Sequence, residues 1–99
     1  MYPYALPLPE PWSSQGWSVR IFAREGPEAP HATVRLKTKL WRINLRTMEP
    51  MDTHPPPRDL PKELLELLRM EANIAQLRAW WNKLHPANPV FSEDEHGQD

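Results

Sequence analysis

Alternation of apolar and polar residues predicts the first strand. From Trp17 the apolar residues occupy every second position, with Val19 and Ile21 on one side of the chain and Arg20 on the other. A period of two is typical of a half-buried β-strand, which we place at residues 17–24. One glycine and two prolines then interrupt the pattern, which predicts a turn or a short loop.

A change of parity in the next segment predicts a β-hairpin. Apolar residues lie at even positions up to Leu36 and at odd positions from Trp41 onward. A two-residue turn at residues 38–39 explains this change, because it sets Leu36 opposite Trp41 on one apolar face. Threonine and lysine are poor turn formers, so the prediction depends on the register. We expect strands at residues 32–37 and 40–46.

The second half of the chain is predicted to be helical. Residues 47–58 contain four prolines and predict a loop. Asp59 is suited to cap a following helix, and Pro61 is suited to its first turn. Leucine and other apolar residues then recur at steps of three, four or seven, which marks one side of a helix. We first expect a single helix over residues 60–84, with two helices that break near Asn73 as the alternative.

These elements predict an α+β fold, in which a small three-stranded antiparallel sheet, a meander, packs against one long or two short C-terminal helices. We expect one domain at residues 17–91, because 99 residues leave room for only one. Residues 1–16 are a proline-rich arm that is either mobile or clipped to the body by Trp12. Residues 92–99 carry four acids and no apolar residue, which predicts a disordered tail.

The chain is rich in tryptophan and has no cysteine. Five tryptophans can anchor a small core that no disulfide supports. The hairpin register places Trp41 on the apolar face, and Trp81 lies on the helical stripe, so we expect the two rings to meet. The chain starts without a secretory signal pattern, and no apolar stretch is long enough to span a bilayer. We expect a cytoplasmic protein that does not bind membranes.

Charge is distributed unevenly, although the net charge is only −1. Residues 20–46 hold seven basic and two acidic side chains, a net charge of +5, whereas residues 47–99 have a net charge of −5. In the predicted sheet, the basic side chains and one aromatic ring lie on the face opposite the apolar one. The candidate binding residues on this face are Arg20, Phe22, Arg24, Arg35, Lys37, Arg42 and Arg46.

This basic face has three interpretations. The predicted register sets Arg35 directly opposite Arg42, and like charges opposed across strands are destabilising unless a partner neutralises them. The face is an ordinary solvated surface, a surface for a protein partner or a second copy of the chain, or a surface for single-stranded nucleic acid. We favour a protein partner or homo-oligomer over nucleic acid, because dedicated nucleic-acid modules are usually basic overall.

The pattern contains no motif of a catalytic or metal site. His31 follows a proline at the start of a strand and is the one weak catalytic candidate, but a local hydrogen bond explains it more simply. Asp52, His54 and His31 match no metal-site spacing. Glu63 and Glu66, three residues apart, are typical of a solvated helix face. We therefore expect no metal and no cofactor, and the sequence favours a non-enzymatic role.

Three short motifs follow one another in a distinctive order: Glu25-Gly-Pro-Glu-Ala-Pro-His31, Thr38-Lys-Leu-Trp41 and Leu60-Pro-Lys-Glu-Leu64. In this order they resemble the bacterial family catalogued as domain of unknown function 4160, over about residues 17–84. The resemblance implies a strand, a hairpin opened by histidine and a C-terminal helix. It also implies an interaction or regulatory setting rather than a reaction, because the family's genes often neighbour toxin–antitoxin-type genes. A nucleic-acid-binding or toxin-like ribonuclease role that uses the basic sheet face is the alternative. Thr33 stands where family members often carry a second histidine.

Overall fold

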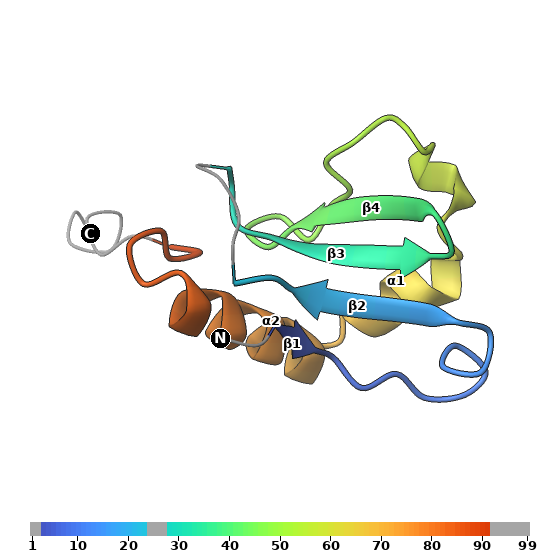
Figure 1. Ribbon diagram of the computed structural model, residues 1–99, viewed down its shortest axis with the longest axis horizontal. Helices are drawn as coiled ribbons and strands as arrows, with labels where there is room; N and C mark the ends of the chain where they lie inside the picture. Colours follow the sequence, from blue (N-terminus) through green and yellow to red (C-terminus); the bar gives the residue numbers. More distant parts are fainter. Residues whose placement is uncertain (1–2, 24–27, 92–99) are drawn as a thin grey trace.

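The computed structural model describes residues 3–23 and 28–91, and these residues form an α+β fold with an antiparallel sheet, as predicted (Figure 1). The strands lie in the order β1 (Tyr4–Ala5), β2 (Trp17–Ile21), β3 (His31–Leu36) and β4 (Lys39–Asn44). A short 3-10 helix, η1 (Pro57–Asp59), precedes α1 (Lys62–Leu68) and α2 (Glu71–Leu84), and both α-helices lie against one face of the sheet. Neither of these helices is long and apolar enough to cross a membrane.

The prediction of three strands was wrong, because the proline-rich arm contributes a fourth. β1 pairs antiparallel with β2 at the edge of the sheet. Leu6 follows it into the core, and the Tyr4 ring stacks on Trp80 of α2 with ring centroids 4.7 Å apart. Trp12 is half-buried against the core. These contacts hold the arm against the body, which is the second of its two predicted alternatives.

The hairpin of β3 and β4 is present, but its register is shifted by two residues. Its two-residue turn consists of Lys37 and Thr38, and Trp41 lies opposite Val34 rather than Leu36. Lys37 has a φ of 56°, the left-handed conformation that the first position of such a turn requires. A shift of two residues preserves parity, so the side chains that lie within β3 and β4 stay on their predicted faces.

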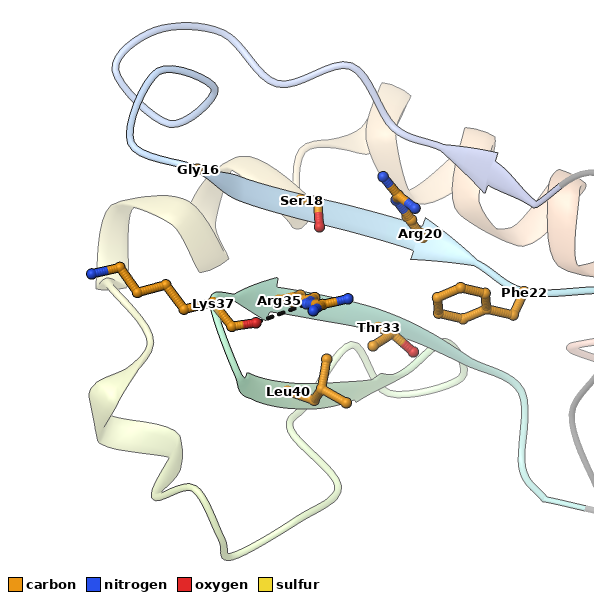
Figure 2. Close-up of a pocket in the computed structure, with 8 residues that line it drawn as sticks. All are labelled: Gly16, Ser18, Arg20, Phe22, Thr33, Arg35, Lys37 and Leu40. Atoms are coloured by element: carbon orange, nitrogen blue, oxygen red, sulfur yellow. Dashed lines mark hydrogen bonds between the residues drawn. The ribbon is translucent and has the colours of Figure 1, made fainter.

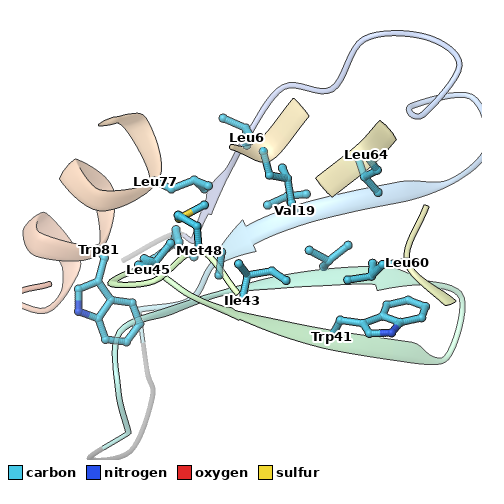
Figure 3. Packing of buried hydrophobic residues seen from close by; sticks show 14 of the residues in the cluster. Leu6, Val19, Trp41, Ile43, Leu45, Met48, Leu60, Leu64, Leu77 and Trp81 are labelled. Carbon is cyan, nitrogen blue, oxygen red and sulfur yellow. The ribbon is translucent and has the colours of Figure 1, made fainter. Parts of the chain in front are cut away.

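The apolar face of the sheet and the helices enclose one core (Figure 3). Val19 and Ile43 from the sheet are fully buried, as are Leu64 of α1 and Leu77 of α2. Alternate residues of β2 and β4 point into this core, as the alternating pattern predicted. The helices do not cover the other face of the sheet, which we name the outer face.

Two tryptophans that were expected to meet lie at opposite ends of the core (Figure 3). Trp41 is 2% exposed, so its predicted burial is confirmed. Its ring lies 5.6 Å from that of Trp17, and its indole N–H donates to the carbonyl of Pro56. Trp81 instead stacks on His85 with ring centroids 3.8 Å apart. The expected contact was wrong because α2, which carries Trp81, runs along the other end of the sheet.

Two helices replace the single helix that we first expected, and the break lies at Arg69 and Met70 rather than near Asn73. Met70 is extended, so the chain turns a corner there. The Asn73 amide donates to the carbonyl of Leu67 across the corner at 2.7 Å, which stabilises it. Asp59 does not cap α1, because it lies in η1 instead.

Candidate binding site on the outer face of the sheet

Two adjoining pockets hollow the outer face of the sheet. Phe22, Thr33 and Leu40 line both of them and form their common floor. Phe22 directly follows β2, Thr33 lies in the middle of β3, and Leu40 lies at the start of β4. The two pockets differ in charge, because different charged residues surround the common floor.

The first pocket, about 420 Å³ in volume, is called the basic pocket here (Figure 2). Arg20 and Arg35 line it, and within the described part of the chain neither forms an ion pair. Arg35 donates from Nε to the carbonyl of Lys37 at 2.8 Å, while the Lys37 ammonium points away from the pocket. Leu40 lies opposite Arg35 and is 47% exposed. The basic pocket thus combines two available guanidinium groups with an apolar surface.

The second pocket, about 360 Å³, is called the ion-pair pocket. Arg42 donates to both carboxylate oxygens of Asp52, from Nε at 2.9 Å and from Nη2 at 2.6 Å, and it also pairs with Glu28. The hydrogen bonds from Arg42 hold the pKa of Asp52 below its usual value. The same contact raises the pKa of Arg42. The charge of Arg42 is therefore neutralised within the chain.

The predicted opposition of two arginines was wrong. Arg42 lies opposite Thr33, and Arg35 lies opposite Leu40. No like-charge repulsion therefore has to be relieved by a partner at these positions. Asp52, from the loop after β4, supplies the counter-charge for Arg42.

The outer face is consequently not uniformly basic: the basic pocket is positively charged, whereas the ion-pair pocket also contains two carboxylates. Arg46 lies outside both pockets and donates from Nε to the carbonyl of Val90 at 2.6 Å. Arg24 lies outside the described residues. Of the seven candidate binding residues, the basic pocket brings together Arg20, Phe22, Arg35 and Lys37, and the ion-pair pocket contains Arg42.

His31 lies at the rim of the ion-pair pocket but is only 2% exposed. Its Nδ1 is 2.8 Å from the carbonyl oxygen of Ala29, and because a carbonyl only accepts, Nδ1 carries the hydrogen. This is the local hydrogen bond that explained the residue more simply than catalysis. His54 lies beside Thr53, with its Nδ1 3.2 Å from the hydroxyl. Residues 3–23 and 28–91 contain no group of three histidines or acids arranged to hold a metal ion.

Sequence reasoning missed Leu40, Glu28 and Asp52 as residues of the site. Leu40 was within reach, because the alternation that turned Trp41 inward also turns its neighbour outward. The pairing of Asp52 with Arg42 had no local signal, since Asp52 lies ten residues further along the chain, in the loop after β4. Glu28 is 14 residues from Arg42 and gave no signal either.

Comparison of the chain with protein-family models, with curated proteins and with solved structures gives no match. The motif resemblance to domain of unknown function 4160 therefore stays a prediction. That resemblance also supplied no catalytic residue.

Proposed function

We propose that this chain is a non-enzymatic interaction module whose basic pocket binds an acidic and partly apolar segment of a protein partner. The observation that carries the proposal is that Arg20, Arg35 and the exposed Leu40 line one pocket, with no carboxylate partner for either arginine among the described residues. Guanidinium groups bind carboxylates in a directed, often bidentate manner. Leu40 adds apolar contact area, so the pocket suits a segment in which acidic and apolar side chains alternate.

The charges of the ion-pair pocket limit which kinds of partner suit the outer face. Glu28 and Asp52 place two carboxylates beside the path that continues from the basic pocket. A uniformly anionic polymer meets repulsion there, because only Arg42 offsets these two charges. A protein segment avoids this repulsion, since it can be acidic at one end and neutral or basic at the other.

Single-stranded nucleic acid is the second candidate, from another class of partner. Phe22 favours it, because this half-buried ring lines both pockets beside the arginines. In single-strand-binding proteins, bases stack on such rings while phosphates contact basic side chains. A toxin-like ribonuclease role would use the same surface.

Two probes distinguish these candidates: an extended peptide of alternating glutamate and leucine, and single-stranded polyuridine. We expect the peptide to bind, and we expect the double variant Arg20→Gln/Arg35→Gln to weaken binding by about tenfold or more, because charge-assisted hydrogen bonds are lost. Arg58→Gln is the matched control, since Arg58 is exposed and lines neither the basic pocket nor the ion-pair pocket. Isothermal titration calorimetry measures the affinity of the parent, the double variant and the control for each probe.

Salt dependence provides the deciding measurement. Binding through several phosphates weakens linearly on a plot of log affinity against log salt, with a slope of about −0.7 for each phosphate contact with a single strand. Polyuridine binding with such a slope, together with no peptide binding, would make nucleic acid the first candidate. Equal affinity of the parent and the Arg20→Gln/Arg35→Gln variant for both probes would show that the basic pocket binds neither.

A further inference from the structure

A third pocket, of about 430 Å³, lies beside α1 and is acidic. Trp12, Leu67 and Met70 line it together with Glu63 and Glu66, and we call it the acidic pocket. Both glutamates are exposed, and neither forms an ion pair with another residue of the described ranges 3–23 and 28–91. Met70 is 56% exposed at the corner between the two α-helices. The acidic pocket thus has two available carboxylates and one prominent apolar side chain.

The acidic pocket and the basic pocket are complementary in charge and in apolar surface. Two available carboxylates in one correspond to the guanidinium groups of Arg20 and Arg35 in the other. Each pocket also contains an exposed large apolar residue, Met70 or Leu40. Methionine is unbranched and adapts its shape to a partner surface. Opposite charges steer such surfaces together and fix their orientation.

The two pockets cannot meet within one molecule. α1 buries Leu64 and Leu68 toward the core and lies against the apolar face of the sheet (Figure 1). The basic pocket lies on the outer face of the sheet, on the opposite side of the molecule. Contact between them therefore requires two molecules. Such a contact joins two different surfaces of identical chains and repeats into a ring or an open chain.

We propose that the partner of the basic pocket is a second copy of this chain, which docks through its acidic pocket. The proposal deepens the proposed function and rests on it, because it uses the same basic pocket. In the contact, Glu63 and Glu66 of one copy pair with Arg20 and Arg35 of the other. Met70 packs beside Leu40 and Phe22, where it covers the exposed apolar surface of both copies.

Two neutralising double variants test this contact: Arg20→Gln/Arg35→Gln and Glu63→Gln/Glu66→Gln. Sedimentation velocity at low salt is expected to show concentration-dependent self-association of the parent, weakened by more than about tenfold in each variant. An equimolar mixture of the two variants is expected to form a dimer with one copy of each. Each variant keeps one intact pocket of opposite kind, so a single contact forms and growth stops there. Arg58→Gln is the control and is expected to associate like the parent.

Circular dichroism and urea unfolding check that both variants are folded. If a double variant is not folded, the single variants Arg35→Gln and Glu66→Gln repeat the test with smaller effects. A monomeric parent at low salt, a mixture without dimers, or variants that associate like the parent each overturn the proposal. The glutamate–leucine peptide separates the two levels of failure. Peptide binding without self-association overturns only the second copy as partner, whereas loss of both overturns the binding role of the basic pocket.

Discussion

Trp41 and Arg42 are neighbours in β4, yet different parts of the chain determine their environments. Trp41 points into the core, where the local alternation of apolar and polar residues places it. Arg42 points to the outer face, where Asp52 and Glu28 from two loops fix its contacts. Leu40 also points to the outer face, but it is exposed there. Local pattern thus decides which face a side chain occupies, while distant contacts decide which outer charges are available to a partner.

The sharpest test of the difference between the two faces compares Trp41→Ala with Leu40→Ala. Trp41→Ala is expected to lower the free energy of unfolding by about 3 to 5 kcal/mol, because it leaves a cavity in the core. Leu40→Ala is the control on the outer face, and we expect a change within about 0.5 kcal/mol. Urea unfolding monitored by circular dichroism measures both. Equal losses in the two variants would show that the faces do not differ in this way.

The Arg42 ion pair gives the second test, through its pH dependence. Asp52→Asn removes the charge of a partly exposed pair, and we expect a loss of about 0.5 to 1 kcal/mol at neutral pH. The pKa of Asp52 is lowered in the folded state, because Arg42 donates to its carboxylate. This contribution is therefore complete above the unfolded pKa of about 3.9 and is lost as the pH falls through the lower folded value.

Urea midpoints of the parent and Asp52→Asn, measured over a pH series, are expected to differ at neutral pH and to converge in acid. Asp59→Asn is the matched control, because Asp59 is exposed and forms no ion pair with the residues that the structure describes. It is expected to change the midpoint little at any pH. A difference for Asp52→Asn that persists in strong acid would mean that the introduced amide, rather than the loss of the carboxylate charge, changes the stability.

The smallest expected effect concerns the turn that connects β3 and β4. Lys37→Gly relieves the positive φ of 56°, and we expect a gain of a few tenths of a kcal/mol, because glycine adopts this conformation without steric cost but is more flexible when unfolded. Thr38→Gly is the control, since only the first turn residue has a positive φ. It is expected to lower stability instead. Thermal unfolding detects both, and a gain at Thr38 with a loss at Lys37 would contradict the observed register.

The helical half shows where sequence reasoning reached its limit. The apolar periodicity continues across Arg69 and Met70, so the pattern alone favoured one helix. The break depends on a contact distant in sequence, in which Arg69 donates to the carbonyl of Met48 at 3.0 Å. β1 was missed for a similar reason. A strand of two residues has no period of its own and exists only because β2 lies beside it.

The candidate site likewise combines residues that the local pattern predicted with contacts that it could not predict. Arg20 and Arg35 were predicted on the outer face from alternation alone, because that signal lies within each strand. The loss of Arg42 as an available cation was not predictable, because Asp52 reaches it from the loop that follows β4. Trp41 was placed on the correct face despite a wrong cross-strand partner, since a register error of two residues leaves parity intact.

Prolines lie at both edges of the sheet, where they reduce the number of backbone donors. Pro3 and Pro7 flank the short strand β1, and Pro50 forms the bridge beside Ile43 on the outer edge of β4. A free strand edge recruits further strands by backbone hydrogen bonding, which is how amyloid elongates, but proline has no N–H to donate. Both edges of the sheet therefore offer an added strand fewer backbone donors than edges without proline would.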